Sequence, residues 1–130
     1  MRIKVAATKT RSGVLLRFTE AQKQLICETL MFHADRPDGD SSSVVRLGVD
    51  RPSAARMVKK AAGSSSEFQL GEIHVLFAAL VSAPVMIPSE EVFYERIGFF
   101  REQAFALADG LVNAIGAAPD WIGESSGSTY

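Results

Sequence analysis

The sequence predicts an α+β fold, in which a small, mainly antiparallel sheet is covered by helices and the chain ends in a long helix. Three observations lead to this prediction. Alternating apolar residues near the N-terminus indicate a hairpin. Short helical and extended patterns follow one another through the middle of the chain, separated by residues that favour turns. Near the C-terminus, apolar residues recur every three or four positions, which is the period of a helix. We expect no internal repeat.

The hairpin is expected over residues 2–7 and 14–18, where apolar side chains alternate with others. A polar link over residues 8–13 joins the two runs. It ends in Gly13, a residue type that tolerates positive φ. The hairpin and one or two later strands make up the expected sheet.

The first helix is expected to begin after Thr19. Thr19 and Gln22 have the spacing of a capping box, in which each side chain accepts a hydrogen bond from the backbone N–H of the other residue. The helix should end near His33 or Ala34, because Pro37 disfavours helical backbone in the residue before it.

Five shorter elements are expected between the first helix and the last. Asp50 or Ser53 can cap a helix that Gly63 ends. The expected elements are a strand over 44–49, a helix over 52–62, a strand over 67–70, a helix over 72–82 and an extended segment over 85–87.

The last helix is expected from Val92 to Ile115. Ser89 is a good N-cap for it, and Pro119 prevents its continuation. The sequence therefore predicts one α+β domain over residues 1–122, followed by a flexible Gly/Ser-rich tail over residues 123–130.

The composition is that of an ordinary globular protein. Of 130 residues, 47% are hydrophobic and 22% are charged, which excludes a largely disordered or collagen-like chain. The single cysteine excludes an internal disulfide and a site built from several thiolates. The N-terminus lacks the apolar segment of a secretory signal, and the most apolar stretch is too short to cross a bilayer. We therefore expect a cytoplasmic protein without membrane contact.

Charge is divided unevenly along the chain. Residues 1–60 hold twelve basic and six acidic residues, a net charge of +6, whereas residues 61–130 hold two basic and nine acidic residues, a net charge of −7. Such asymmetry can mark contact with nucleic acid or a membrane. It can equally reflect two segments that attract each other within one small domain, and this is the interpretation we favour.

The last helix carries more apolar residues than one core-facing stripe needs. Its acidic residues share a stripe opposite the core face and are expected to be solvated. In a monomer the additional apolar residues would expose a large patch, so the helix is expected to contribute to a homodimer or to bind another protein. The alternative is a central helix wrapped by the rest of the chain. The candidate interface residues are Val92, Tyr94, Phe99, Phe105 and Val112.

Basic residues crowd the helix expected over 52–62 and the hairpin tip, and such residues can follow a phosphate backbone. The sequence shows no helix-turn-helix spacing, zinc signature or aromatic stacking platform, so a solvated basic face is the favoured interpretation. The candidate nucleic-acid-binding residues are Lys9, Arg11, Arg51, Arg56, Lys59 and Lys60.

No strong catalytic motif is apparent in the sequence. His33 and His74 are of the residue type that titrates near neutrality, but neither has a nucleophile or an acid at a diagnostic spacing. Cys27 has no histidine partner motif and is expected to be a small buried hydrophobe. The acids of residues 35–40 do not have the ligand spacing of a calcium loop. We expect no catalytic residue, no metal and no cofactor.

The expected function is that of a small non-catalytic intracellular protein that acts through protein–protein contacts as a homodimer. Accessory, regulatory and immunity-type bacterial proteins are of this kind, an analogy that rests on size and the lack of motifs. Two alternatives stay open. One is a nucleic-acid-associated regulator that uses the basic N-terminal half. The other is an enzyme with an unrecognised site near His74 or His33.

Overall fold

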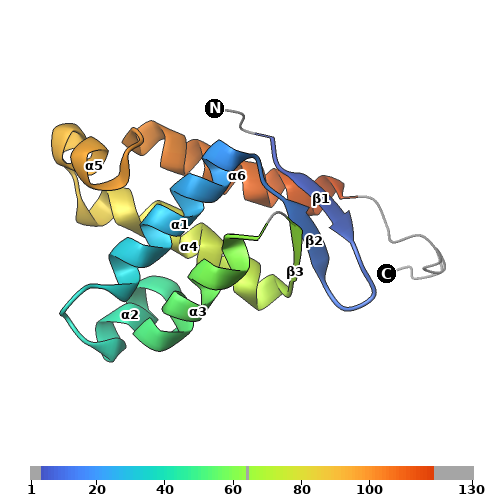
Figure 1. The fold of residues 1–130 in the computed structure, drawn as a ribbon, viewed down its shortest axis with the longest axis horizontal. Coiled ribbons are helices and arrows are strands. Elements are labelled where there is room, and N and C mark those ends of the chain that lie inside the picture. The colour runs from blue at the N-terminus through green and yellow to red at the C-terminus, as the bar shows by residue number, and fades with distance from the viewer. Residues whose placement is uncertain (1–3, 64, 119–130) are drawn as a thin grey trace.

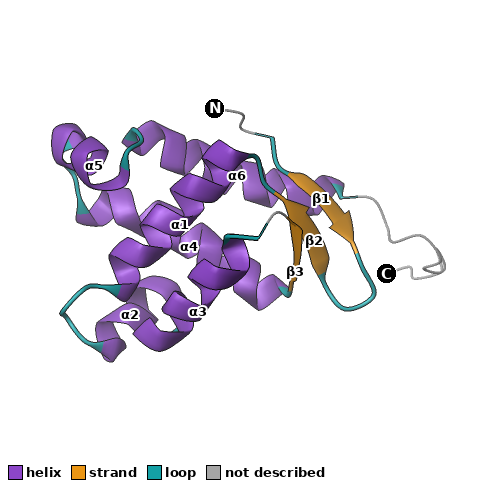
Figure 2. Ribbon diagram, in the orientation of Figure 1, coloured by secondary structure: helices purple, strands orange, loops and turns teal. Residues whose placement is uncertain are grey.

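A computed structural model describes residues 4–63 and 65–118, with a three-stranded sheet at one end and helices over the rest (Figures 1 and 2). It confirms the α+β class and the long C-terminal helix. The tail expected over 123–130 lies outside the described residues. The strands are β1 (Ala6–Lys9), β2 (Val14–Arg17) and β3 (Ser65–Phe68). The helices are α1 (Glu20–Ala34), α2 (Asp40–Leu47), α3 (Arg51–Ala61), α4 (Leu70–Met86), α5 (Glu90–Ile97) and α6 (Arg101–Ala117).

β2 lies at the centre of the sheet, between β1 and β3 and antiparallel to both, which confirms the N-terminal hairpin. The hydroxyls of Thr10 and Ser12 in the hairpin loop donate to the carboxylate of Glu67 on β3. Gly13 does not use a positive φ. A Cβ atom there would lie 2.4 Å from the carbonyl oxygen of Phe68, so the close approach of β3 requires glycine at this position.

α1 and α4 pack against each other at the centre of the helical region. α3 covers α1, and α6 covers α4. The remaining two helices pack on the opposite central helix: α2 packs on α4, and α5 packs on α1. The core therefore lies between α1 and α4. It extends beneath the sheet, where Leu16 and Phe68 are fully buried.

The helices form two sets related by a constant shift along the chain. α4, α5 and α6 begin fifty residues after α1, α2 and α3, respectively. The contacts between helices repeat with the same shift, since the packing of α1 against α3 corresponds to the packing of α4 against α6. The buried positions repeat as well. Matching pairs are Leu25 and Val75, Ile26 and Leu76, Leu30 and Leu80, Leu47 and Ile97, Ala54 and Ala104, Met57 and Leu107, and Ala61 and Leu111.

The sheet completes an approximate twofold symmetry. β2 precedes α1 as β3 precedes α4, and the two strands pair with each other. Leu16 pairs with Ser66, its own counterpart fifty residues on, so the approximate axis passes through this pair. The chain thus contains an internal structural repeat, and the expectation of none is wrong. We call residues 4–63 the first half and residues 65–118 the second half.

Each half has a three-residue turn between its second and third helices. Gly48 and Gly98 end α2 and α5 with φ values of 84° and 88°, a region of backbone space that favours glycine. The surrounding sequences share the pattern Arg–(Leu or Ile)–Gly–x–x–Arg, where x is a variable residue, over residues 46–51 and 96–101.

The second arginine of this pattern braces the turn in both halves. Arg51 and Arg101 open α3 and α6, and their backbone N–H groups donate to the acids that open the preceding helices, Asp40 and Glu90. The Arg51 side chain also bonds Asp40, at 2.8 Å. Because the same brace recurs at matching positions, it is a property of the repeat and not of one half.

Three expected elements are wrong. The strand expected over 44–49 is the end of α2 and its turn, because Ser43 and Leu47 are buried four residues apart, which is a helical spacing. The extended segment over 85–87 belongs mostly to α4, which runs through Pro84. That proline lies in the last turn, so few helical hydrogen bonds depend on it. The helix over 92–115 is two helices, because the positive φ of Gly98 ends α5.

The first helix begins as expected, and its cap can be tested. The Gln22 backbone N–H donates to the Thr19 hydroxyl at 3.2 Å, and the Thr19 N–H donates to Gln22 Oε1 at 2.9 Å. We expect Thr19→Ala to lower the free energy of unfolding by about 1 kcal/mol, measured by urea denaturation. Thr19→Ser keeps the hydroxyl and should stay close to wild type. Equal stability of the alanine variant and wild type would contradict the capping role.

Candidate functional site

The exposed aromatic side chains of the second half lie on the outer faces of α5 and α6. Tyr94, Phe100 and Phe105 are 49%, 52% and 41% exposed, and Val112 is 55% exposed. The rings of Tyr94 and Phe100 stack with centroids 4.9 Å apart. Phe100 is the N-cap of α6, and Phe105 and Val112 lie further along that helix at exposed positions. We call these four residues the α5–α6 patch.

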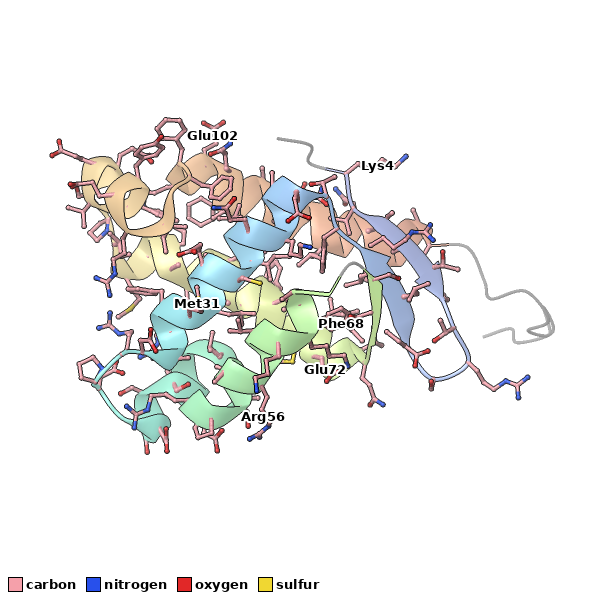
Figure 3. All side chains as sticks on the ribbon, in the orientation of Figure 1. Lys4, Met31, Arg56, Phe68, Glu72 and Glu102 are labelled. Carbon is pink, nitrogen blue, oxygen red and sulfur yellow. The ribbon has the colours of Figure 1, made fainter. Side chains whose placement is uncertain are left out.

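Acidic side chains border the patch. Glu102, Phe105, Asp109 and Val112 succeed one another at spacings of three and four along α6, so they form one exposed stripe. Glu91 lies one turn before Tyr94 on α5 and is also exposed. The patch therefore combines aromatic rings with carboxylates, and Glu102 marks its position at the upper edge of the molecule (Figure 3).

Two of the five expected interface residues lie outside the patch. Val92 is 48% exposed, but it is two residues from Tyr94 and so points about 160° away around α5. Phe99 packs against the core and is only partly exposed. Phe100 is missing from the expected set, because the pattern of a continuous helix assigns it to the core-facing stripe.

The internal repeat provides a comparison for the patch. Fifty residues earlier, the positions of the patch hold smaller or polar side chains in the same local structure. The core positions of the two halves match, so the fold of the repeat does not need aromatic residues on this face. The counterparts of Tyr94, Phe100, Phe105 and Val112 are Val44, Asp50, Ala55 and Ala62.

The basic residues of α3 divide into two groups. Arg51 bonds Asp40 and the carbonyl oxygen of Arg36. Lys60 pairs with Glu72 at 2.7 Å and lies over the ring of Phe68. These two side chains are used within the fold. Arg56 and Lys59 are exposed on the outer face of α3.

The structure does not bring all the candidate nucleic-acid-binding residues together. Lys9 ends β1 and Arg11 lies in the hairpin loop. Figure 1 shows the tip of this hairpin well away from α3. The first half therefore presents two separate positive surfaces.

α2 and α3 form two helices joined by a three-residue turn containing Gly48, which is the connection of a helix-turn-helix. The sequence hides this connection, because the apolar residues over 44–49 predict a strand there. The same connection recurs in α5 and α6, where the outer face of the third helix is acidic. The turn therefore belongs to the repeat and is not by itself a sign of DNA binding.

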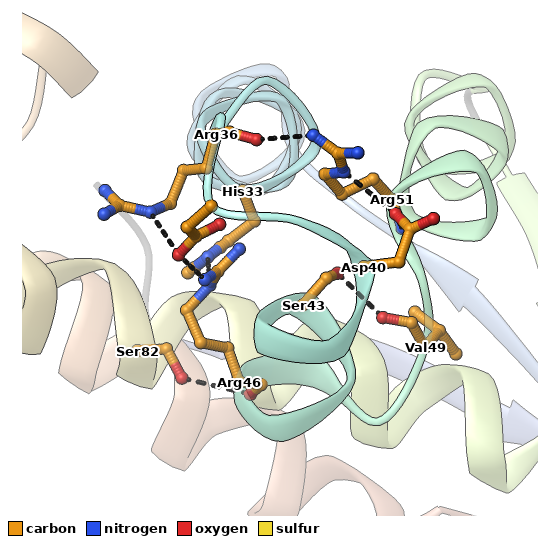
Figure 4. Close-up of polar contacts among 9 residues, drawn as sticks. His33, Arg36, Asp40, Ser43, Arg46, Val49, Arg51 and Ser82 are labelled. Atoms are coloured by element: carbon orange, nitrogen blue, oxygen red, sulfur yellow. Dashed lines mark hydrogen bonds and ion pairs between the residues drawn. The ribbon is translucent and has the colours of Figure 1, made fainter.

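A polar cluster joins α1, α2 and α4 (Figure 4). His33 is fully buried, its Nε2 3.2 Å from the carbonyl oxygen of Ala79 and its Nδ1 3.1 Å from Nε of Arg46. A carbonyl only accepts and a guanidinium only donates, so Nε2 carries the proton and Nδ1 accepts. Asp38 forms ion pairs with Arg46 and Arg36 at the edge of the cluster.

The chemistry of this cluster is structural. Burial lowers the pKa of His33 to about 4, and the neighbouring charges of Arg46 and Arg36 act in the same direction. The ring is therefore neutral near pH 7. Both of its nitrogens are engaged, so neither is free to take a proton from a substrate.

His74 and Cys27 lie elsewhere. His74 is exposed, stacks on Phe77 and lines a groove of about 660 Å³ between α3 and the start of α4. The nearby carboxylate of Glu72 is held by Lys60. Cys27 is partly buried, and burial raises the pKa of its thiol, which disfavours the nucleophilic thiolate.

Comparison with known proteins gives no relative, since no family model, curated protein or solved structure matches the chain. Within residues 4–63 and 65–118, no group of three or more histidine, cysteine or acidic residues is placed to hold a metal ion. Among the helices described there, none has the length and apolarity needed to span a membrane. The function must therefore be inferred from the surfaces of the fold.

The buried histidine gives stability a pH dependence of definite sign. Its pKa is about 4 in the folded chain and about 6.5 in an unfolded one. Below pH 6.5 the unfolded chain thus takes up a proton that the folded chain does not. We expect the free energy of unfolding to fall by about 1–2 kcal/mol from pH 7 to pH 5, measured by urea denaturation.

The control is His33→Gln, which can still donate to Ala79 and accept from Arg46 but does not titrate. The variant should lose most of the dependence between pH 7 and pH 5. A wild-type stability as independent of pH as that of the variant would contradict the assignment of a neutral buried ring.

Proposed function

We propose that this chain is a non-catalytic protein-interaction module whose α5–α6 patch is covered by another protein chain. The observation that carries the proposal is the difference between the two halves. Most core positions of the helices match, yet exposed tyrosine and phenylalanine side chains of the described residues lie in the second half alone. A homo-oligomer remains the expected form of this association.

The chemistry of the patch suits protein docking. Half-exposed tyrosine and phenylalanine rings still have much apolar area to remove from water, and burying a large apolar side chain contributes about 1.5–3 kcal/mol. Aromatic residues are also enriched among the residues that dominate interface energies. The carboxylates of Glu102 and Asp109 beside Phe105 give the patch a polar rim, as interfaces commonly have.

The first test uses a photo-crosslinking benzoyl-phenylalanine in place of Val112, at the edge of the patch. We expect it to crosslink to a protein chain, either a second copy or a different protein, in host-cell extract. The same group in place of Val45, which is 86% exposed on α2, is the control and should give little product. Equal crosslinking from both positions would contradict the proposal.

A matched variant replaces three residues of the patch by their counterparts in the first half. Tyr94→Val, Phe100→Asp and Phe105→Ala together should reduce crosslinking from position 112 by roughly tenfold or more, because removing an aromatic ring from an interface commonly costs over about 1 kcal/mol. The variant should remain folded, since Asp50 already caps α3 at the matching position. A folded variant with undiminished crosslinking would show that the patch is not the docking surface.

A second candidate is nucleic-acid binding, favoured by the helix-turn-helix connection of α2 and α3 with Arg56 and Lys59 facing outward. Filter binding to duplex DNA at low salt tests it, with Arg56→Gln, Lys59→Gln as the variant. If these side chains bind phosphates, each replacement should lower the salt slope by roughly one unit. We expect no tight binding, because two of the four basic residues on α3 are already paired. Tight binding that the variant abolishes would put this candidate first.

A further inference from the structure

Resting on the proposed function, we infer that the protein covering the acidic stripe of α6 is a second copy of this chain, which presents the basic outer face of its α3. The contact is head-to-tail, because it joins two different surfaces. We call Glu102, Phe105, Asp109 and Val112 the acidic face. We call Pro52, Ala55, Arg56, Lys59 and Ala62 the basic face.

Charge complementarity is the first ground for the inference. Glu102 on the acidic face has no hydrogen bond or ion pair with any residue in the described part of the chain, and Asp109 bonds only Asn113 there. Lys59 on the basic face is likewise unpaired among the described residues, and Arg56 bonds only the hydroxyl of Ser53, although its charge also acts on the carboxylate of Asp50. Opposite charges are therefore available on both surfaces.

The second half cannot neutralise the acidic face itself. Its basic residues are Arg96 and Arg101. Arg96 lies 5.1 Å over the ring of Phe32 on α1, and the guanidinium of Arg101 donates to the carbonyl oxygen of Pro84. Both cations are therefore held by contacts away from Glu102 and Asp109.

The two faces lie at opposite edges of the molecule. Figure 3 shows Arg56 at the lower edge and Glu102 at the upper edge. α1 and α4 lie between them, since α3 covers α1 and α6 covers α4. The basic face of a chain therefore cannot reach its own acidic face, and the contact must form between two molecules.

Side-chain size gives a second ground, independent of charge. At matching positions, the acidic face has Phe105 and Val112 where the basic face has Ala55 and Ala62. All four side chains are exposed. Small residues on one helix accept large residues from another, as alternating large and small side chains do in packed cores.

A symmetrical dimer with one acidic face against another fits less well. It would bring Glu102 and Asp109 of each copy near the same residues of the other, and like charges across an interface disfavour association. The head-to-tail contact instead joins a segment of net charge +6 to one of −7, which nearly cancel in a chain of net charge −1. Head-to-tail contacts form rings when the rotation closes and open chains when it does not.

The test uses two charge-reversed variants. The acidic-face variant is Glu102→Lys, Asp109→Lys, and the basic-face variant is Arg56→Glu, Lys59→Glu. Sedimentation velocity should show wild-type mass rising with concentration to at least twice the monomer mass of 14.1 kDa. Association should weaken at high salt, because ions screen exposed charges. Each variant alone should remain monomeric.

Mixing the two variants is the decisive step. Each retains the native surface that the other lacks, so a 1:1 mixture can form the native contact, and the two reversed faces are also opposite in charge to each other. We expect the mixture to associate to at least a heterodimer, although neither variant associates alone. The control Glu20→Lys, Asp35→Lys makes the same change of net charge at exposed positions on and just after α1 and should associate as wild type does. Circular dichroism checks folding, with Glu102→Gln, Asp109→Asn as milder replacements.

Several results would overturn the inference. They are a wild-type chain that stays monomeric at high micromolar concentration, a folded variant that still associates, a mixture that stays monomeric, or a dimer lost in the acidic-face variant alone. Crosslinking from position 112 to a different protein, with a monomeric purified chain, would overturn this inference and leave the proposed function standing. A monomeric chain that also gives no crosslink from position 112 would overturn both.

Discussion

The packing of α1 against α4 is the contact on which the rest of the structure depends. Neither helix is covered by its own half alone, because α2 packs on α4 and α5 packs on α1. Leu30 and Leu80 occupy matching positions in the two helices and are fully buried. Since each half supplies part of the cover for the other, the two halves share one core and are expected to unfold together.

Local signals in the sequence are sufficient for several elements. The capping box at Thr19 and the proline at position 37 define α1, because both act within a few residues. The break at Gly98 is hidden because Phe93, Ile97 and Ala104 keep a helical spacing across it, as both α5 and α6 face the same core. The repeat is hard to see in the sequence because most matching core positions hold different residues, such as Leu25 and Val75, and few identities other than the arginine–glycine–arginine pattern at each turn mark the shift of fifty.

The candidate surface is predictable in part. Apolar residues in excess of one core-facing stripe are visible in the periodicity of the sequence, and three of those predicted in this way, Tyr94, Phe105 and Val112, are exposed. The sequence predicts Phe99 at the interface and Phe100 in the core, whereas in the structure Phe99 packs against the core and Phe100 is exposed. The difference arises because these positions depend on where one helix ends and the next begins. Sequence alone does not show that Arg51 and Lys60 are held by Asp40 and Glu72, because those ion pairs join residues eleven or twelve positions apart.

Lys60 and its counterpart Gly110 show where two similar halves become different. Gly110 is buried and, with Val5 and Ala6, lines the groove between α6 and β1. Lys60 instead places its ammonium 4.9 Å over the ring of Phe68, at the end of the edge strand β3. Charged side chains, lysine above all, commonly guard edge strands against pairing with further strands. At matching positions, one half thus has a glycine facing the groove beside β1, and the other has a charge beside the edge strand β3, where it opposes edge-to-edge aggregation.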